Sequence, residues 1–153
     1  MKLLEDKIAV ITGGGRGIGK ATAKQFIEEG ATVVIAEFDE NSGQSTAKEL
    51  GAHFFKTDIS NEESVHSLFD FVKSEFSRLD ILVNNAATGV QRSASELESK
   101  HWDWTMNVNA KGPWLCSIEA AKLMESGGHI INITSEGSRR VLPFYFSVGT
   151  SKA

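Results

Sequence analysis

The chain has 153 residues, a formal net charge of −4, 41% hydrophobic and 24% charged residues, and two prolines. A chain of this length has the size of one domain and buries enough apolar surface to fold without disulfides or metals. The mild negative charge, with Arg139-Arg140 as the longest basic run, argues against a nucleic-acid surface or a membrane-adsorbing helix. We therefore expect one globular domain, residues 1–153, that acts on small molecules.

Cysteine and histidine content bears on redox and metal chemistry. Cys116 is the single cysteine and cannot form an internal disulfide, which fits a reducing compartment. The histidines are too scattered to form a metal cluster with it, so we expect no metal site; they are His53, His66, His101 and His129. The N-terminus lacks the apolar core of a signal peptide, and no apolar run approaches membrane-spanning length, so we expect a cytoplasmic protein.

Five short apolar runs recur along the chain and predict β-strands. Most of them are continuous instead of alternating with polar residues, which is typical of strands covered on both faces of a parallel sheet. The predicted strands are 8–11, 33–36, 54–55, 81–83 and 130–133.

Helix-length segments separate these strands. The clearest begins with Ser60-Asn61-Glu62-Glu63, a capping-box pattern, and continues with apolar residues that form one helix face up to Phe76. Other helices are predicted at 17–29, 42–50, 96–108 and 113–125. The alternation predicts an α/β fold with a doubly wound, Rossmann-like parallel sheet, in which ligands bind at the carboxyl ends of the strands.

A glycine-rich turn, Thr12-Gly13-Gly14-Gly15-Arg16-Gly17-Ile18-Gly19, joins the first predicted strand to the first predicted helix. Glycines let the backbone approach a pyrophosphate closely, and the helix N-terminus offers unpaired N–H groups. The second strand ends in Glu37, 18 positions beyond Gly19 (37 − 19), where an acid can bind the adenosine ribose. This order favours a dinucleotide site over a flexible turn.

Glu37 also bears on the choice of nucleotide. A carboxylate at this position accepts a hydrogen bond from a ribose 2′-hydroxyl but repels a 2′-phosphate, which favours NAD(H) over NADP(H). Arg16 favours the opposite choice if it pairs with a 2′-phosphate, or has no effect if it is a solvated loop charge. We give Glu37 the greater weight and expect NAD(H), with NADP(H) as the alternative.

Along nearly its whole length, the chain resembles the short-chain dehydrogenase/reductase family. The glycine turn matches the family's TGxxxGxG form, and Asn84-Asn85-Ala86-Ala87 is similar to its NNAG motif, with alanine in the last position. Asp58 resembles the adenine-contacting acid, although alone it could be a helix cap. The cofactor-binding residues implied by the resemblance are Gly13, Gly15, Arg16, Gly17, Ile18, Gly19, Glu37, Asp58, Ile59, Asn85, Ala86 and Lys152.

The same resemblance implies catalytic residues. Asn109 is at the place of the family's helix asparagine, which supports a proton-relay water, and Ser135 is at the place of the catalytic serine. The family usually has its tyrosine four residues before the lysine, but four residues before Lys152 the chain has Val148, which cannot donate a proton. Tyr145 is the only tyrosine and precedes Lys152 by seven residues.

A Tyr-x6-Lys spacing is similar to that of the enoyl-acyl-carrier-protein reductases of this superfamily. The stretches 83–90, 101–111 and 147–153 look most like the type III members, although Glu37 departs from their association with NADPH. The resemblance implies that hydride from NAD(P)H reduces a 2-enoyl thioester in fatty-acid synthesis, with Tyr145 on the thioester oxygen, Ser135 positioning the carbonyl and Lys152 on the nicotinamide ribose. It also implies acyl carrier protein as a partner and a homodimer or homotetramer.

Two other functions stay open. One is a carbonyl or alcohol dehydrogenase of the same family with a displaced tyrosine. The other is a truncated nucleotide-binding domain without catalysis, in which Tyr145 is an ordinary loop residue. Three tryptophans are interpreted as core or subunit-contact residues instead of cofactor contacts; they are Trp102, Trp104 and Trp114.

The end of the chain suggests that later elements are missing. Members of the family continue beyond the lysine, and the predicted sheet order 3-2-1-4-5 lacks the sixth and seventh strands. We therefore expect the strand near 130–133 to be an unpaired edge that favours self-association or disorder. We also expect no helix to hold Lys152, whose ammonium group would be too mobile for catalysis.

Overall fold

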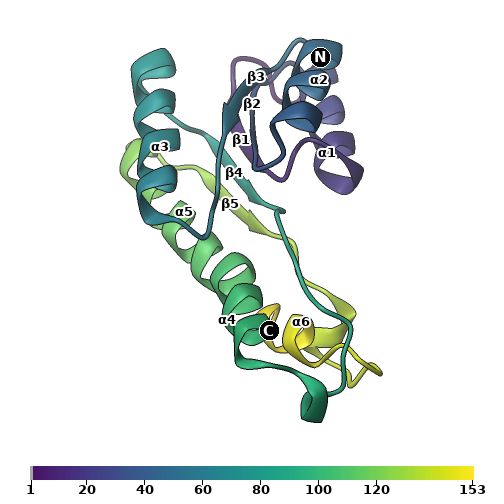
Figure 1. Cartoon of the computed structure of the whole chain (residues 1–153). Helices are drawn as coiled ribbons and strands as arrows, with labels where there is room; N and C mark the ends of the chain where they lie inside the picture. The colour runs from purple at the N-terminus through teal and green to yellow at the C-terminus, as the bar shows by residue number, and fades with distance from the viewer. Residues whose placement is uncertain (1) are drawn as a thin grey trace.

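A computed structural model describes residues 2–153 of the chain. Five strands form one parallel sheet in the order β3-β2-β1-β4-β5 (Figure 1), which confirms the predicted order. The strands are β1 (Ile8–Thr12), β2 (Thr32–Glu37), β3 (His53–Lys56), β4 (Ile81–Asn84) and β5 (His129–Asn132). All five therefore end at the same edge of the sheet.

Helices cover both faces of this sheet. In Figure 1, α1 and α2 lie on one face, and α3 and α5 lie on the other. The helices are α1 (Gly17–Glu28), α2 (Glu40–Leu50), α3 (Glu62–Phe76), α4 (Ser99–Met106), α5 (Gly112–Leu123) and α6 (Phe146–Ser151). The chain has the Rossmann-like α/β fold that the alternating pattern predicts.

Each face of the sheet has its own core, because successive strand residues point to opposite faces. Val10 and Val34 pack in one cluster with side chains of α3 and α5, whereas Ile11 and Ile35 pack in the other cluster with Ala23 of α1. All five of these side chains are fully buried. Complete burial of a valine or isoleucine stabilises the fold by roughly 1.5–3 kcal/mol per side chain, so the central strands are the best-anchored part of the sheet.

Helix α3 begins one residue later than a capping box at Ser60 predicts. Asn61 is its N-cap and accepts a hydrogen bond from the Ser64 N–H at 2.9 Å. Ser60 does not cap the helix because its hydroxyl donates to Asp58 at 2.6 Å. A hydrogen bond to a charged carboxylate is stronger than the bond that a serine hydroxyl accepts from a helix N–H. Ser60 therefore bonds to Asp58, and the helix starts after Asn61.

The predicted helices 96–108 and 113–125 are not separate. A π-helix, η2 (Asn107–Lys111), joins α4 directly to α5, and the backbone stays helical through Gly112. Pro113, in the first turn of α5, has no N–H and cannot make the regular i to i−4 bond. The wider turn of the π-helix accommodates this missing bond, so the proline does not end the helix.

Strand β5 is the edge of the sheet in residues 2–153, as predicted. All four of its residues are exposed, with Ile130 at 39% and Ile131 at 42%. The expectation that Lys152 lacks a helix is wrong, because α6 (Phe146–Ser151) ends directly before it. The Gly149 N–H donates to the Tyr145 carbonyl at 2.8 Å, which starts this helix before the lysine instead of at it.

Candidate nucleotide and catalytic site

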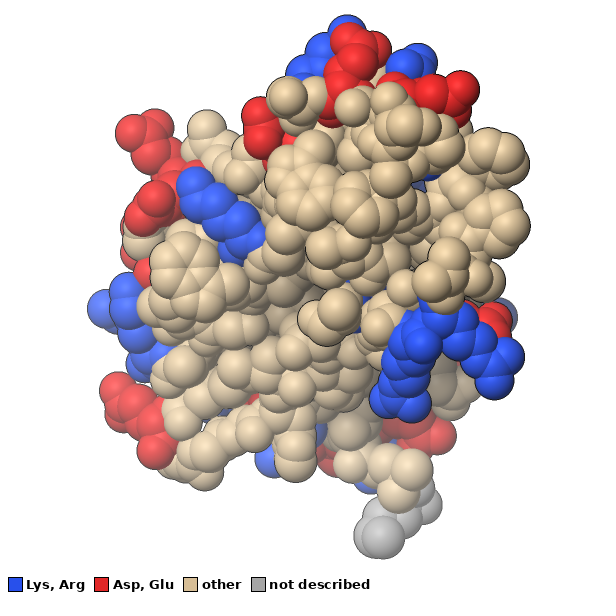
Figure 2. Space-filling view, turned by 90° about the horizontal axis from the view of Figure 1, so that it is seen from below, with Lys and Arg blue, Asp and Glu red and all other residues tan. Residues whose placement is uncertain are grey.

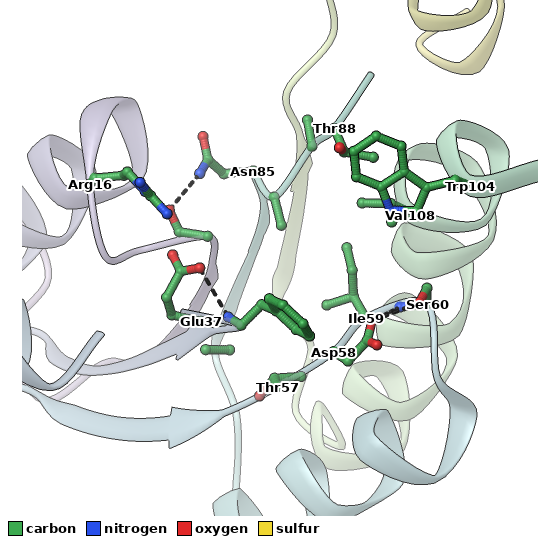
Figure 3. A pocket seen from close by; sticks show the side chains of 15 residues that line it. Arg16, Glu37, Thr57, Asp58, Ile59, Ser60, Asn85, Thr88, Trp104 and Val108 are labelled. Atoms are coloured by element: carbon green, nitrogen blue, oxygen red, sulfur yellow. Dashed lines mark hydrogen bonds between the residues drawn. The ribbon is translucent and has the colours of Figure 1, made fainter. Parts of the chain in front are cut away.

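A cavity of about 670 Å³ lies at the carboxyl ends of β1, β2, β3 and β4 (Figure 3). Of the predicted cofactor-binding residues, its lining contains Gly13, Arg16, Glu37, Asp58, Ile59, Asn85 and Ala86. The predicted residues outside the lining are Gly15, Gly17, Ile18, Gly19 and Lys152. The strand ends thus bring together side chains that are separated by up to 73 positions (86 − 13) in the sequence.

Two glycines of the turn are required by close packing. Gly13 has φ = 65°, and a Cβ at this residue would lie 2.8 Å from the Ala86 Cα. A Cβ at Gly19 would overlap the Gly13 carbonyl oxygen. The glycine turn is therefore folded tightly against the start of α1 and against the segment that follows β4.

Asn85 holds this turn in place. Its side-chain amide donates to the carbonyls of Thr12 at 3.0 Å and Gly13 at 3.1 Å, and its backbone N–H donates to the Thr12 hydroxyl at 3.0 Å. Asn85 also lines the nucleotide cavity, and its contact with the cofactor stays a prediction. The geometry gives Asn85 the task of positioning the turn from the neighbouring strand.

Glu37, the last residue of β2, lines the cavity and is 9% exposed. Its carboxylate accepts hydrogen bonds from the backbone N–H groups of Gly15 at 3.0 Å, Phe38 at 2.9 Å and Asp39 at 3.2 Å. These three hydrogen bonds fix the orientation of the carboxylate. The acid therefore connects the end of β2 to the glycine turn.

Arg16 pairs with an acid that the sequence analysis did not single out. Its guanidinium lies 3.2 Å from the Asp39 carboxylate, and both side chains are exposed. Asp39 also caps α2, because it accepts a hydrogen bond from the Ser42 N–H at 3.1 Å. The Asp39-x-x-Ser42 spacing is a readable helix-cap signal, but the ion pair with Arg16 depends on how the turn folds over β2.

Aromatic side chains add to the walls of the cavity. Trp104, on α4, and Phe38, directly after β2, line it and are 49% and 66% exposed. Figure 3 shows Trp104 near Thr88, opposite the glycine turn. The interpretation of Trp104 as a core or subunit-contact residue missed this position, because the sequence does not say where α4 lies relative to the sheet.

Ser135 and Tyr145 meet beside α6. Their hydroxyl oxygens lie 3.1 Å apart, within hydrogen-bonding distance. A Cβ at Gly137 would overlap the Tyr145 ring, so the glycine lets the ring pack against the backbone after β5. The structure brings the two residues together, although ten positions separate them.

Lys152 is anchored, contrary to the expectation of a mobile ammonium group. Its Nζ donates to the Ile133 carbonyl at 2.9 Å, and its own carbonyl accepts a hydrogen bond from the Thr134 hydroxyl at 2.8 Å. Burial lowers the pKa of the Lys152 ammonium below its ordinary value. These contacts hold the lysine against the segment between β5 and Ser135.

Asn109 connects the two halves of the site. It lies in η2 and is 4% exposed. Its side-chain oxygen accepts a hydrogen bond from the Thr88 N–H at 2.8 Å, and its side-chain nitrogen donates one to the Thr88 carbonyl at 2.7 Å. The same amide donates to the Ser151 hydroxyl at 3.0 Å. Thr88 lines the nucleotide cavity and Ser151 precedes Lys152, so Asn109 fixes the spacing between them.

Val148 occupies the place where the family usually has tyrosine. A Cβ added at Gly89 would overlap the Val148 side chain, so valine and glycine pack closely here.

Cys116 is fully buried, and burial raises the pKa of its thiol to about 12, which excludes it as a thiolate at neutral pH. Within residues 2–153, no helix is both long and apolar enough to span a membrane.

The parallel sheet, the tight glycine turn and the cavity at the strand ends define a Rossmann-like domain. The sequence profile described as short chain dehydrogenase matches residues 7–153. The chain belongs to the short chain dehydrogenase family.

Individual relatives agree with this assignment. An uncharacterized oxidoreductase of Thermotoga maritima is 42% identical over 140 residues, covering 87% of this chain and 55% of the relative. An uncharacterized oxidoreductase of Staphylococcus aureus is 39% identical over 141 residues, covering 88% and 61%. A 3beta-hydroxysteroid dehydrogenase of Mediterraneibacter gnavus is 35% identical over 150 residues, covering 94% and 54%. The chain spans a little more than half the length of these relatives.

Proposed function

We propose that the protein is an NAD(P)(H)-dependent oxidoreductase in which Tyr145 is the proton donor. The observation that carries the proposal is the 3.1 Å contact between the Ser135 and Tyr145 hydroxyls; Lys152 is anchored to the Ile133 carbonyl, two residues before Ser135. A pair of hydroxyl groups can stabilise negative charge that develops on a substrate oxygen, and the half-buried Lys152 follows α6, the helix that begins after Tyr145. Asn109 holds this group at a set distance from the nucleotide cavity.

The cavity at the strand ends fits a dinucleotide. The N–H groups at the start of α1 would hold the pyrophosphate, Glu37 the adenosine ribose, and Asp58 the adenine edge. Phe38 and Ile59 line the same cavity and supply apolar surface for a flat ring. Arg16 is already paired with Asp39 at 3.2 Å, so it is a weak competitor to Glu37, and we propose NAD(H) over NADP(H).

The bound nicotinamide would supply the hydride. Lys152 would hold its ribose, and the positive charge of Lys152 would favour proton donation by Tyr145. Ser135 would position the substrate oxygen against the tyrosine hydroxyl. Every one of these groups lies between β5 and Lys152, directly after α6, and Asn109 links Ser151 to Thr88 of the nucleotide cavity.

For the substrate, we propose an enoyl thioester, with acyl carrier protein as its carrier. The Tyr-x6-Lys spacing supports this reaction, and Val148 beside Gly89 leaves no hydroxyl at the other tyrosine position. The second candidate is a carbonyl or alcohol dehydrogenase, which the similarity to a 3beta-hydroxysteroid dehydrogenase favours.

We also propose a homo-oligomer, because Trp114 and Ile118 on α5 are 59% and 41% exposed and form an apolar strip.

Substrate reduction by the full-length protein separates the candidates. Oxidation of NADH is followed by absorbance with crotonyl-coenzyme A, with a cyclic ketone and with no substrate. We expect turnover with the thioester and none with the ketone. Turnover with the ketone alone would favour the second candidate, and no turnover with either would contradict both reductase assignments.

A further inference from the structure

A second cavity, of about 510 Å³, shares no lining residue with the nucleotide cavity. Its walls come from residues 92–94, the end of η3 (Glu136–Ser138), the loop 139–145 and α6. Tyr145 is part of its lining, and the backbone of Tyr145 pairs with that of Arg92. The cavity therefore adjoins the residue that we assign to proton donation.

The charges of this cavity are all of one sign. Its charged lining side chains are Arg92, Arg139 and Arg140, and no aspartate or glutamate is in the lining, although the whole chain has a net charge of −4. Figure 2, seen from below the view of Figure 1, shows a mostly uncharged centre, with a group of basic side chains beside an acidic one at lower right and side chains of both signs along the left and the top. Such a local concentration of positive charge attracts an anion.

The three arginines differ in their partners. Arg92 lies 3.3 Å from the Glu98 carboxylate, and Arg140 lies 3.1 Å from that of Glu136. Arg139 has no ion pair within residues 2–153. Two of the positive charges are thus compensated by nearby acids, and the charge of Arg139 is not.

The rest of the lining is largely apolar. Leu142, Pro143, Phe144 and Phe146 contribute to it, and Phe146 also packs against Trp102 with ring centroids 5.6 Å apart. Apolar walls suit a hydrocarbon body, and a guanidinium group suits a carboxylate or phosphate, which it can bind through two parallel hydrogen bonds.

We propose that this cavity binds an amphipathic anion: an apolar body in contact with Leu142 and the phenylalanines, and a carboxylate or phosphate paired with Arg139. The proposal rests on the proposed function, in which one end of the substrate reacts at Tyr145. It adds that the rest of the substrate is apolar and carries an anionic group that pairs with Arg139. It applies to an enoyl thioester and to a carbonyl compound alike.

Binding of simple probes to the full-length protein tests the proposal without any turnover. Octanoate, octyl phosphate and the neutral octanamide are titrated by calorimetry, with tryptophan fluorescence as a second signal because Trp102 contacts Phe146. We expect at least one anion to bind about tenfold more tightly than octanamide, the effect of one charge-assisted contact. The tighter of the two anions identifies the group as carboxylate or phosphate.

Variants assign the binding to this cavity. Arg139→Ala should weaken the preferred anion about tenfold and leave octanamide unchanged, and Arg139→Lys should restore part of the affinity. Lys48→Ala, which removes one positive charge on α2, is the matched control and should change neither. Leu142→Asp should weaken the anion more than octanamide.

Each contrary result overturns the proposal. It fails if neither anion binds, if octanamide binds as tightly as both anions, or if the anion affinity is unchanged in the Arg139→Ala and Leu142→Asp variants. Oxidation of NADH is measured separately, so anion binding without reduction of any substrate would contradict the proposed function and leave this cavity's ligand class supported.

Discussion

The nucleotide side and the Tyr145 side of the molecule are positioned by different means. In β1, β2 and β4 nearly every residue is buried, whereas all four residues of β5 are exposed. The glycine turn, Glu37 and Asn85 of the nucleotide cavity lie at the ends of these three buried strands. The residues around Tyr145 are held mainly by hydrogen bonds between loops and a six-residue helix.

Because of this difference, we expect substitutions to affect function and stability together on the nucleotide side and function alone on the Tyr145 side. A change at the nucleotide side meets tightly packed backbone, so it acts through steric overlap and affects folding as well as binding. A change at the Tyr145 side removes a hydrogen bond from a partly exposed group and costs little stability. The following substitutions test that contrast.

The largest effect is expected from Tyr145→Phe. The phenylalanine ring keeps the packing against Gly137 but loses the hydroxyl that contacts Ser135, so turnover of the full-length protein should fall about 10²- to 10⁴-fold. The affinity for NADH, measured by fluorescence titration, and the free energy of unfolding should change little. Unchanged turnover would remove Tyr145 from the mechanism.

Gly19→Ala should act on binding and folding together. Its Cβ would overlap the Gly13 carbonyl, so the turn must shift. We expect the free energy of NADH binding to fall by about 2–3 kcal/mol, which is roughly 30- to 160-fold weaker binding, and the free energy of unfolding to fall as well. Gly51→Ala is the control, because Gly51 has φ = 70° but open space around it. That variant should lose about 1 kcal/mol of stability and bind NADH normally. Equal NADH affinities in the two variants would contradict the tight turn.

Glu37→Arg should change nucleotide preference by a smaller amount. The unmodified protein should bind NADH more tightly than NADPH, and the variant should shift the ratio toward NADPH by about tenfold, because a repulsive charge is replaced by an attractive one. Glu49→Arg makes the same charge change on exposed α2 and should leave the ratio as it was. Tighter binding of NADPH by the unmodified protein would show that Arg16 outweighs Glu37.

The smallest effect is expected at the edge strand. Ile131 is 42% exposed, so Ile131→Ala should lower the free energy of unfolding by less than about 1 kcal/mol. The same substitution at Ile35, which is fully buried in β2, should cost about 2–5 kcal/mol. Urea unfolding of the full-length protein measures both. A larger loss at Ile131 would indicate that another part of the protein covers β5.

The comparison also explains which features were readable in the sequence. The apolar runs, the glycine turn and Glu37 at the end of β2 lie within short stretches, where side-chain periodicity and backbone freedom act locally. The doubly wound parallel sheet followed from the alternation of strands and helices. The start of α3 was predicted one residue early. The bond from Ser60 to Asp58 that competes with capping forms only in the folded loop, so the local pattern does not reveal it.

Other features depend on segments that meet only in the folded chain. Asn85 reaches the Thr12 carbonyl across 73 positions, Asn109 reaches Ser151 across 42, and Lys152 reaches the Ile133 carbonyl across 19. The position of Trp104 in the cavity likewise depends on where the π-helix places α4. The sequence by itself determined the strands, the glycine turn and the acid after β2, because these arise from local propensity. Only the tertiary structure decided that Lys152 is anchored, since its hydrogen-bond acceptor becomes its neighbour only when β5 and α6 have packed together.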